Sequence, residues 1–235
     1  MLELGCNNGA NLLPLAYYRR HAQFVGIDGA RLPIATAEAR RSELKLSNIE
    51  FIHTDFRHAK KFVSGHFNYI IAHGIFSWVS ESVRDELLEL IAHCLCPGGL
   101  VYLNYNAQPG WKIRGMIREF LISQTADEDT LSLRVQRAKA VAGNLASSLS
   151  NIQQPYSQLL ANEFHFVCQG DDSWVGHEYL EPDNHSYWRR EFLSLARRAQ
   201  LEYVADADFN YNYRNVPQSL LDQLRLSGIT GHSVE

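Results

Sequence analysis

Short apolar runs alternate with helix-forming stretches through the first hundred residues, and this alternation limits the folds open to the chain. The intervening stretches predict helices over 10–22, 31–46 and 80–95, with Pro97-Gly98-Gly99 ending the last of them. Strands that alternate with helices favour a parallel sheet covered on both faces. The apolar runs predict five buried strands, at residues 2–4, 24–28, 49–53, 67–72 and 100–105.

The pattern changes after Tyr105. Residues 112–165 predict helices with no strand between them, including one helix over 131–150, and residues 170–173 predict a loop. We therefore expect an α/β fold: a Rossmann-like, doubly wound, mostly parallel sheet with a helical insertion after the fifth strand.

The last part of the chain is expected to return to the sheet. Residues 186–200 predict a helix, and Leu201 to Ala205 predict a sixth strand. The expected regions are a core (1–106), a helical regulatory or insertion subdomain (107–180), and a C-terminal helix and strand completing the sheet (181–235).

A glycine turn joins the first strand to the first helix, and it contains Glu3, Gly5, Asn7 and Gly9. Glycine suits a backbone that turns sharply or approaches a ligand, and the helix that follows directs free N–H groups at that ligand. The dinucleotide pattern G-x-G-x-x-G is absent. A carboxylate at Glu3 suits a ligand with sulfonium and amino cations better than a diphosphate. An ordinary strand–helix turn is the alternative interpretation.

Two aspartates follow the next two strands. Asp28, followed by Gly29, stands nineteen residues after Gly9, a spacing at which an acidic residue can accept hydrogen bonds from both ribose hydroxyls of an adenosine. Asp55 ends the third strand and is predicted to accept a hydrogen bond from the adenine amino group, with Phe56 against the ring. Turn or helix-cap aspartates are the alternative.

Aromatic residues and a histidine follow the fourth and fifth strands. His73, Phe76 and Trp78 offer an imidazole and an aromatic wall, which favours cationic methyl donors and alkylammonium acceptors. The alternative is that Phe76 and Trp78 are core residues and His73 caps the next helix. Tyr105 is expected either beside the acceptor or in hinge packing.

Composition narrows the partners. A net charge of −4 lacks the basic footprint of a nucleic-acid-binding domain, and no apolar run approaches the ~20 residues that span a bilayer. Met1 leads directly into the glycine motif, so no signal peptide is expected. The four cysteines are predicted to be reduced and packed. We expect a cytoplasmic protein with no nucleic-acid or membrane partner; its oligomeric state is not predicted.

No metal site is expected. The histidines and acids near the end of the helical region do not have the H-E-x-x-H spacing, and scattered surface or core histidines are the better interpretation. Nucleophile-elbow and phosphate-loop motifs are also absent. The residues tested as ligands are His165, His177, Glu178 and His185.

Several of these motifs together resemble class I S-adenosylmethionine (SAM)-dependent methyltransferases. The resemblance implies SAM binding by the glycine turn, with Asp28 on the ribose and Asp55 near adenine. The expected cofactor-binding residues are Glu3, Gly5, Asn7, Gly9, Asp28, Gly29, Asp55, Phe56 and His73. A closer resemblance is to bacterial methyltransferases with a methyltransferase regulatory domain, some of which methylate protein lysines. The general motifs are 3–9, 26–28, 54–56 and 97–99, and the closer ones are 69–79, 83–85, 105–116, 177–180 and 199–203.

Two departures from the family accompany this resemblance. Asn7 stands where glycine is usual, although asparagine tolerates the left-handed conformation better than most residues. The chain begins within the first strand, so we expect an N-terminally truncated core.

The resulting hypothesis is a SAM-dependent methyltransferase, with a protein lysine as the candidate acceptor and His73 and Tyr105 as the candidate catalytic residues. The alternative is a non-catalytic SAM-binding or regulatory module of the same fold. A nicotinamide-dependent oxidoreductase is disfavoured by the missing glycine pattern.

Overall fold

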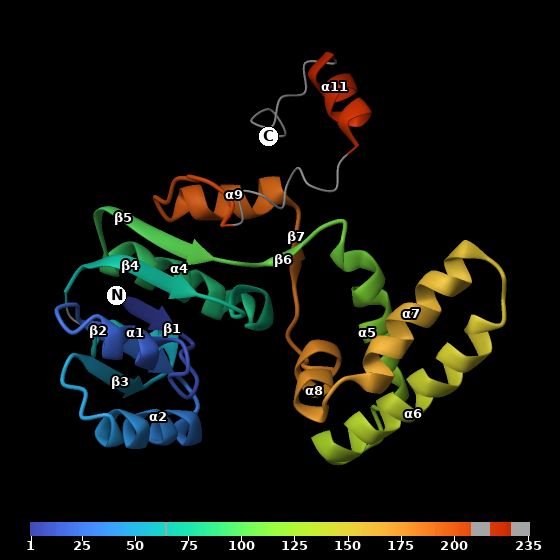
Figure 1. Cartoon of the computed structure of the whole chain (residues 1–235), viewed down its shortest axis with the longest axis horizontal. Coiled ribbons are helices and arrows are strands. Elements are labelled where there is room, and N and C mark those ends of the chain that lie inside the picture. Colours follow the sequence, from blue (N-terminus) through green and yellow to red (C-terminus); the bar gives the residue numbers. More distant parts are fainter. Residues whose placement is uncertain (64, 208–216, 227–235) are drawn as a thin grey trace. The chain divides into compact units, whose positions relative to one another are not determined.

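The computed structural model describes residues 1–63, 65–207 and 217–226, which fall into two compact units (Figure 1). The sheet unit comprises Met1–Tyr105 and resumes at Tyr187, and the helical unit comprises Asn106–Ser186. The division of the chain into a core (1–106), a helical regulatory or insertion subdomain (107–180) and a C-terminal region (181–235) assigns each region a role, and it stays a prediction.

Five parallel strands build the sheet unit, in the order β3-β2-β1-β4-β5. This arrangement confirms the expected doubly wound parallel sheet. Because β1 lies at its centre, the residues after β1, β2 and β4 gather at one edge of the sheet. The strands are β1 (Leu2–Leu4), β2 (Phe24–Asp28), β3 (Ile49–His53), β4 (Phe67–Ala72) and β5 (Leu95–Leu103).

Helices pack on both faces of this sheet but leave Tyr69, Leu100 and Tyr102 of β4 and β5 exposed. On one face, α1 (Leu12–Tyr18) and α2 (Arg31–Glu43) pack against apolar side chains of β2 and β3. On the other, α4 (Glu81–Cys94) and α9 (Arg189–Arg198) pack against β1, β4 and β5. Shorter elements are α3 (Phe56–Ala59) and the 3-10 turn η1 (Phe76–Trp78), and the last described helix is α11 (Gln218–Leu226).

The segment Pro97-Gly98-Gly99 lies within β5 and does not terminate α4, which was the expected role. The helix already ends at Cys94, and the chain enters the strand at Leu95 with an extended backbone. Pairing with β4 then jumps from Phe67↔Leu95 to Tyr69↔Leu100, and Gly98 has φ +76. The glycines therefore accommodate a bulge, which is another common use of glycine in a strand.

The predicted sixth strand at 201–205 is wrong, because these residues form no strand. Tyr203 and Val204 are exposed, and the Tyr203 ring lies 4.7 Å below the Arg189 guanidinium. The Tyr203 hydroxyl donates to Asp206 at 2.9 Å. A β-forming composition gives a strand only where a neighbouring strand offers backbone partners, and no such pairing occurs here.

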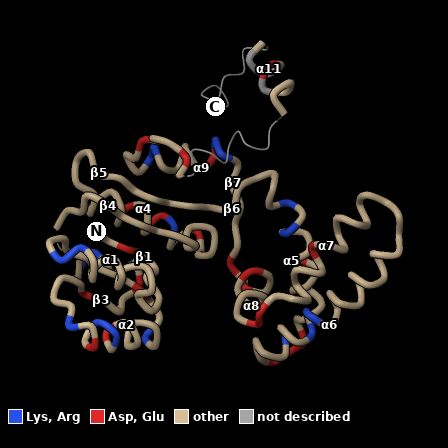
Figure 2. The backbone as a smooth tube through the Cα atoms, viewed as in Figure 1, with Lys and Arg blue, Asp and Glu red and all other residues tan. Residues whose placement is uncertain are grey.

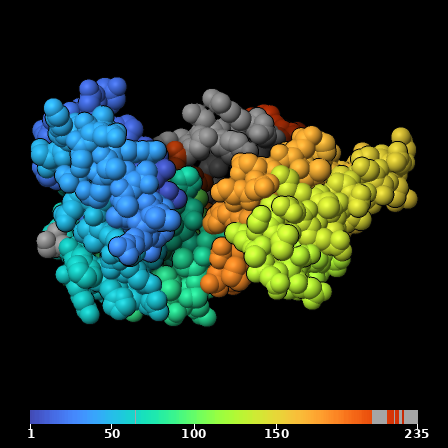
Figure 3. All heavy atoms as spheres, turned by 90° about the horizontal axis from the view of Figure 1, so that it is seen from below, coloured from blue at the N-terminus to red at the C-terminus, as the bar shows by residue number. Residues whose placement is uncertain are grey.

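The helical unit contains α5 (Trp111–Gln124), α6 (Leu131–Ser150), α7 (Pro155–Gln169) and α8 (Asp172–Leu180). The α6 bounds equal the predicted ones. The predicted loop at 170–173 is shorter than expected, because Asp171 caps α8 by accepting from the Trp174 N–H at 2.9 Å. The α6–α7 hairpin extends from this unit (yellow in Figure 3). Two short strands, β6 (Asn106–Ala107) and β7 (Ser186–Tyr187), pair with each other.

A charged cluster joins three helices of the helical unit. The Arg114 guanidinium of α5 lies 2.8 Å from a Glu178 carboxylate oxygen on α8 and 3.6 Å from Glu163 on α7. The same guanidinium lies over the rings of Trp111 and Tyr179, at 5.4 and 6.0 Å. These side chains are largely buried. A charge-assisted hydrogen bond from Arg114 to Glu178 joins α5 to α8, and the longer Arg114–Glu163 ion pair links α5 to α7.

Charged residues of both signs are interspersed along the described helices, with no continuous basic stripe (Figure 2). Among the residues described, none of the helices is both long and apolar enough to span a bilayer.

Candidate cofactor site

The turn between β1 and α1 has three left-handed residues at alternate positions. Gly5 has φ +75, Asn7 φ +48 and Gly9 φ +73. The Gly5 and Cys6 N–H groups both donate to the carbonyl oxygen of Ile27 on β2, at 2.8 and 3.0 Å. The turn therefore curls back over the end of β2.

Close packing explains both glycines. A Cβ on Gly5 would lie 2.2 Å from Ile75 Cδ1, and one on Gly9 would lie 2.6 Å from Phe51 Cζ. Neither position has room for a side chain, and both carry a positive φ. Asn7 is exposed, and its own Oδ1 accepts from the Asn8 N–H at 2.7 Å, which fits asparagine to the left-handed position.

Glu3 lies buried beneath this turn. Its Oε1 accepts from Asn11 Nδ2 at 2.9 Å, while its Oε2 is buried and has no hydrogen-bond partner. Burial raises the pKa of the Glu3 carboxyl, and the hydrogen bond from Asn11 partly opposes that rise. An unsatisfied buried carboxylate oxygen is costly, so a cationic or hydrogen-donating group beside it would be stabilised.

The Asp28 carboxylate faces the glycine turn. Its Oδ2 accepts from the Asn7 N–H and its Oδ1 from the Ala30 N–H, both at 2.8 Å. These bonds hold the carboxylate between the end of β2 and the turn. Gly29 is exposed, and no atom lies within 4 Å of where its Cβ would be. Its carbonyl accepts from His53 Nε2 at 3.1 Å, which ties β2 to β3.

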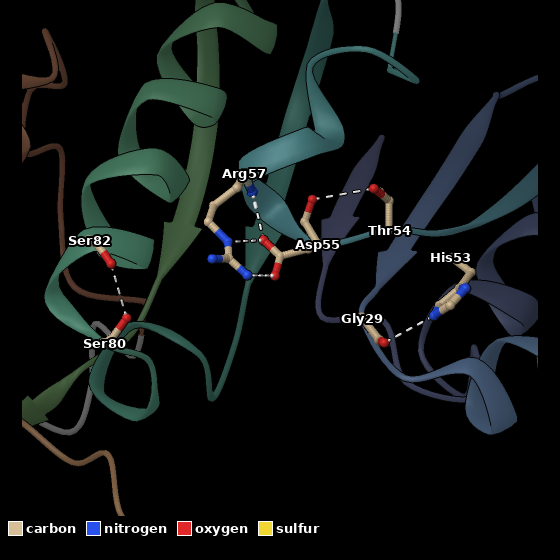
Figure 4. A network of polar contacts seen from close by, with 7 residues as sticks. All are labelled: Gly29, His53, Thr54, Asp55, Arg57, Ser80 and Ser82. Carbon is tan, nitrogen blue, oxygen red and sulfur yellow. Dashed lines mark hydrogen bonds and ion pairs between the residues drawn. The ribbon is translucent and has the colours of Figure 1, made fainter.

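Asp55 leaves the end of β3 and is paired with Arg57 (Figure 4). Its Oδ1 accepts from the Arg57 backbone N–H at 2.9 Å and from Nε at 3.0 Å, and its Oδ2 accepts from Nη2 at 2.7 Å. The Arg57 hydrogen bonds lower the pKa of Asp55 to about 2. The sequence prediction did not include Arg57 as a partner of Asp55. Its position two residues after a possible helix-cap aspartate was the feature of the sequence that could have indicated this pairing. Phe56 is half-buried and packs on the hydrophobic core.

The side chains after β4 separate into exposed and buried ones. His73 is exposed, and its ring meets that of Tyr102 edge-on at 5.6 Å. Phe76 is fully buried, with Phe192 at 5.4 Å and Tyr187 at 5.3 Å. The core interpretation of Phe76 therefore holds, and this ring forms no free aromatic wall.

Tyr105 follows β5 and is half-buried. Its ring stacks on Phe192 of α9, with centroids 3.9 Å apart and planes 20° apart. Burial raises the pKa of the Tyr105 hydroxyl. His73 and Tyr105 thus follow neighbouring strands, each held by a different aromatic partner.

Two residues with no assigned role also shape this edge of the sheet. The Asn104 Oδ1 accepts from the Gly74 N–H at 2.7 Å. Ile75 is the side chain that lies against Gly5. Nothing in the local sequence indicates either contact, because both join segments far apart in the chain. Within the described part of the chain, no group of three or more His, Cys, Asp or Glu side chains is arranged to hold a metal ion.

Comparisons with known proteins agree on one family. Residues 1–99 match a family model described as a methyltransferase domain, and residues 171–232 match a predicted methyltransferase regulatory domain. Two similar proteins come from Rickettsia prowazekii (strain Madrid E). RP789 is 32% identical over 96% of this chain and 41% of its own length, and RP028 is 30% identical over 84% of this chain and 79% of its own.

One solved structure resembles nearly the whole chain. PKMT2 from Rickettsia typhi, in complex with AdoHcy, has a TM-score of 0.84 and 30% identity, covering 97% of this chain and 44% of that one. The chain therefore spans less than half the length of RP789 and of PKMT2.

Proposed function

Because the chain belongs to the bacterial class I SAM-dependent methyltransferases that carry a methyltransferase regulatory domain, we propose that its glycine turn binds SAM and that it methylates a protein lysine. Binding of AdoHcy by PKMT2 supports the cofactor. The lysine acceptor rests on the resemblance to family members that methylate protein lysines.

The position of Asp28 carries the cofactor assignment. Each carboxylate oxygen has two lone pairs, and the Asn7 and Ala30 N–H groups use one on each. One acceptor site per oxygen is left for the two ribose hydroxyls, and the backbone bonds hold the carboxylate in one orientation. Gly29, which has no atom within 4 Å of its Cβ position, would leave room beside the ligand. Gly5, Asn7 and Gly9 would act by shaping the turn, through their left-handed conformations.

Glu3 and Asp55 extend this assignment to the two ends of the ligand. The unpartnered Oε2 of Glu3 would interact with the positive charge of the sulfonium and amino groups. Asp55 would accept from the adenine amino group. Phe56 would offer the adenine only the part of its ring that does not pack against the core.

SAM supplies a methyl group on a positively charged sulfur, which an amine can attack in line. The protein's contribution is then to align the two groups and to remove a proton from the lysine. We assign proton removal through water to His73, which is exposed. The raised pKa of Tyr105 keeps its hydroxyl protonated, so we assign it to orienting the acceptor.

Calorimetric titration with SAM tests the cofactor assignment. We expect Asp28→Ala to abolish measurable binding, because it removes both ribose acceptors and the partner of the Asn7 N–H. Asp85→Ala, an exposed acid on α4, is the matched control and should bind like the wild type. Unchanged affinity in Asp28→Ala would refute the ribose assignment.

Methyl-labelled SAM tests the reaction. The wild-type chain is incubated with total protein from its own bacterium, and labelled residues are identified by mass spectrometry. Label on lysine supports the proposal, and label on another residue contradicts the acceptor. SAM binding without any transfer would favour the non-catalytic module.

A further inference from the structure

The turn after β4 is tied to the neighbouring strand by one side chain. The Gly74 N–H donates to Oδ1 of Asn104, at 2.7 Å and across thirty residues of sequence. Gly74 has φ +70, a conformation that L side chains rarely adopt. The Gly74 N–H is directed at the segment just after β5, where the Asn104 side chain accepts it.

The same turn contacts the glycine turn on its other side. Ile75 packs so closely over Gly5 that a Cβ there would lie 2.2 Å from its Cδ1. His73, on the opposite flank of Gly74, contacts the Tyr102 ring of β5. Asn104 thus lies at one end of a series of contacts that runs through Gly74 and Ile75 to Gly5.

We infer that Asn104 is a positioning residue for methyl transfer. Its amide oxygen fixes the backbone at Gly74. That backbone determines where His73 and Ile75 lie relative to the glycine turn between β1 and α1. The inference rests on the proposed function, because these positions matter for catalysis only if SAM occupies that turn. An error of about 1 Å in aligning reacting groups costs on the order of a hundredfold in rate.

Two substitutions at this position separate the hydrogen bond from the side-chain volume. Asn104→Ala removes the acceptor, whereas Asn104→Asp keeps an acceptor oxygen in nearly the same shape. In Asn104→Ala we expect the Gly74 amide to exchange with solvent about tenfold faster or more. We expect methyl transfer to fall by about tenfold or more, with SAM affinity changed by less than about threefold. Asn104→Asp should restore both exchange protection and transfer.

Asn68→Ala provides the control. Asn68 lies on β4, is exposed, and donates to Cys96 Sγ at 3.3 Å. It should match the wild type in exchange, affinity and transfer. Amide exchange is measured by NMR on the whole chain and SAM affinity by calorimetry. Transfer is measured with methyl-labelled SAM and total protein from the chain's own bacterium.

The outcomes distinguish the inference from the proposed function. A wild-type chain that binds no SAM contradicts the proposed function and the inference together. If the wild type binds and transfers, unchanged Gly74 exchange or unchanged transfer in Asn104→Ala overturns the inference alone. An equal loss of transfer in Asn104→Ala and Asn104→Asp also overturns it, because the acceptor oxygen would then be irrelevant.

Discussion

Replacing Gly9 with alanine perturbs the glycine turn in a way whose magnitude follows from two contacts. The backbone there has φ +73, and a left-handed conformation costs a residue with a Cβ roughly 1–2 kcal/mol. The new Cβ would also lie 2.6 and 2.9 Å from two ring atoms of Phe51, which is only 7% exposed. Overpacking of a buried ring costs about 1–3 kcal/mol. We therefore expect Gly9→Ala to lower the free energy of unfolding by about 2–5 kcal/mol in total.

Urea unfolding followed by circular dichroism measures this loss, and a double-mutant cycle divides it. In a Phe51→Leu background the ring is gone, so Gly9→Ala should cost less by the overpacking share, about 1–3 kcal/mol. Gly29→Ala is the matched control. It has no atom within 4 Å of its Cβ position, and its cost should stay within about 0.5 kcal/mol. A Gly9→Ala cost below about 1 kcal/mol, or equal costs in both backgrounds, would refute the reasoning.

Two further predictions concern Glu3 and Arg114. Burial raises the folded-state pKa of Glu3, so its contribution to stability is present at low pH and is lost as pH rises through that pKa. Cationic SAM favours the ionised form of Glu3, so the wild-type affinity for SAM should strengthen over the same rise in pH. Glu3→Gln should lack this increase, and calorimetry at a series of pH values measures both affinities. The same pH dependence in the wild type and in Glu3→Gln would contradict the assignment. Arg114→Ala leaves Glu163 and Glu178 largely buried without their cation, and urea unfolding should show a loss of roughly 3 kcal/mol. Exposed Arg137→Ala is the control, and an equally small effect of both variants would mean that the cluster is not structural.

The sheet could be predicted because the residues that favour strands locally are also the apolar residues that a helix-covered sheet has to bury. The runs at 24–28, 49–53 and 67–72 have the same bounds in the structure, because mostly apolar runs between helices form the strands of such a sheet. The expected full burial is wrong for β3 and β4, where Glu50, Asn68 and Tyr69 are exposed. The first half of the chain therefore places Asp28 and Asp55 at one edge of the sheet without any knowledge of contacts. The rule that chemistry follows the strand ends needs only the order of the elements.

The remaining features depend on partners that the local sequence does not specify. Residues 201–205 have strand composition but no neighbouring strand, and Pro97-Gly98-Gly99 has the composition of a helix end but accommodates a bulge. The sequence does not decide whether Phe76 lines the site or packs in the core. An aromatic side chain in a turn points inward or outward according to the helices packed over that turn. Its burial became visible only with α9 in place.

The Asp55–Arg57 pair shows how such a partner refines a role assigned from sequence. A carboxylate has about four lone-pair sites. Oδ1 of Asp55 accepts two N–H groups of Arg57, and Oδ2 accepts one. Only Oδ2 keeps an unused site, so an adenine amino group would have to bind that oxygen. If the proposed adenine contact forms, the ion pair with Arg57 would restrict it to the free lone pair of Oδ2 and would hold that oxygen in one orientation.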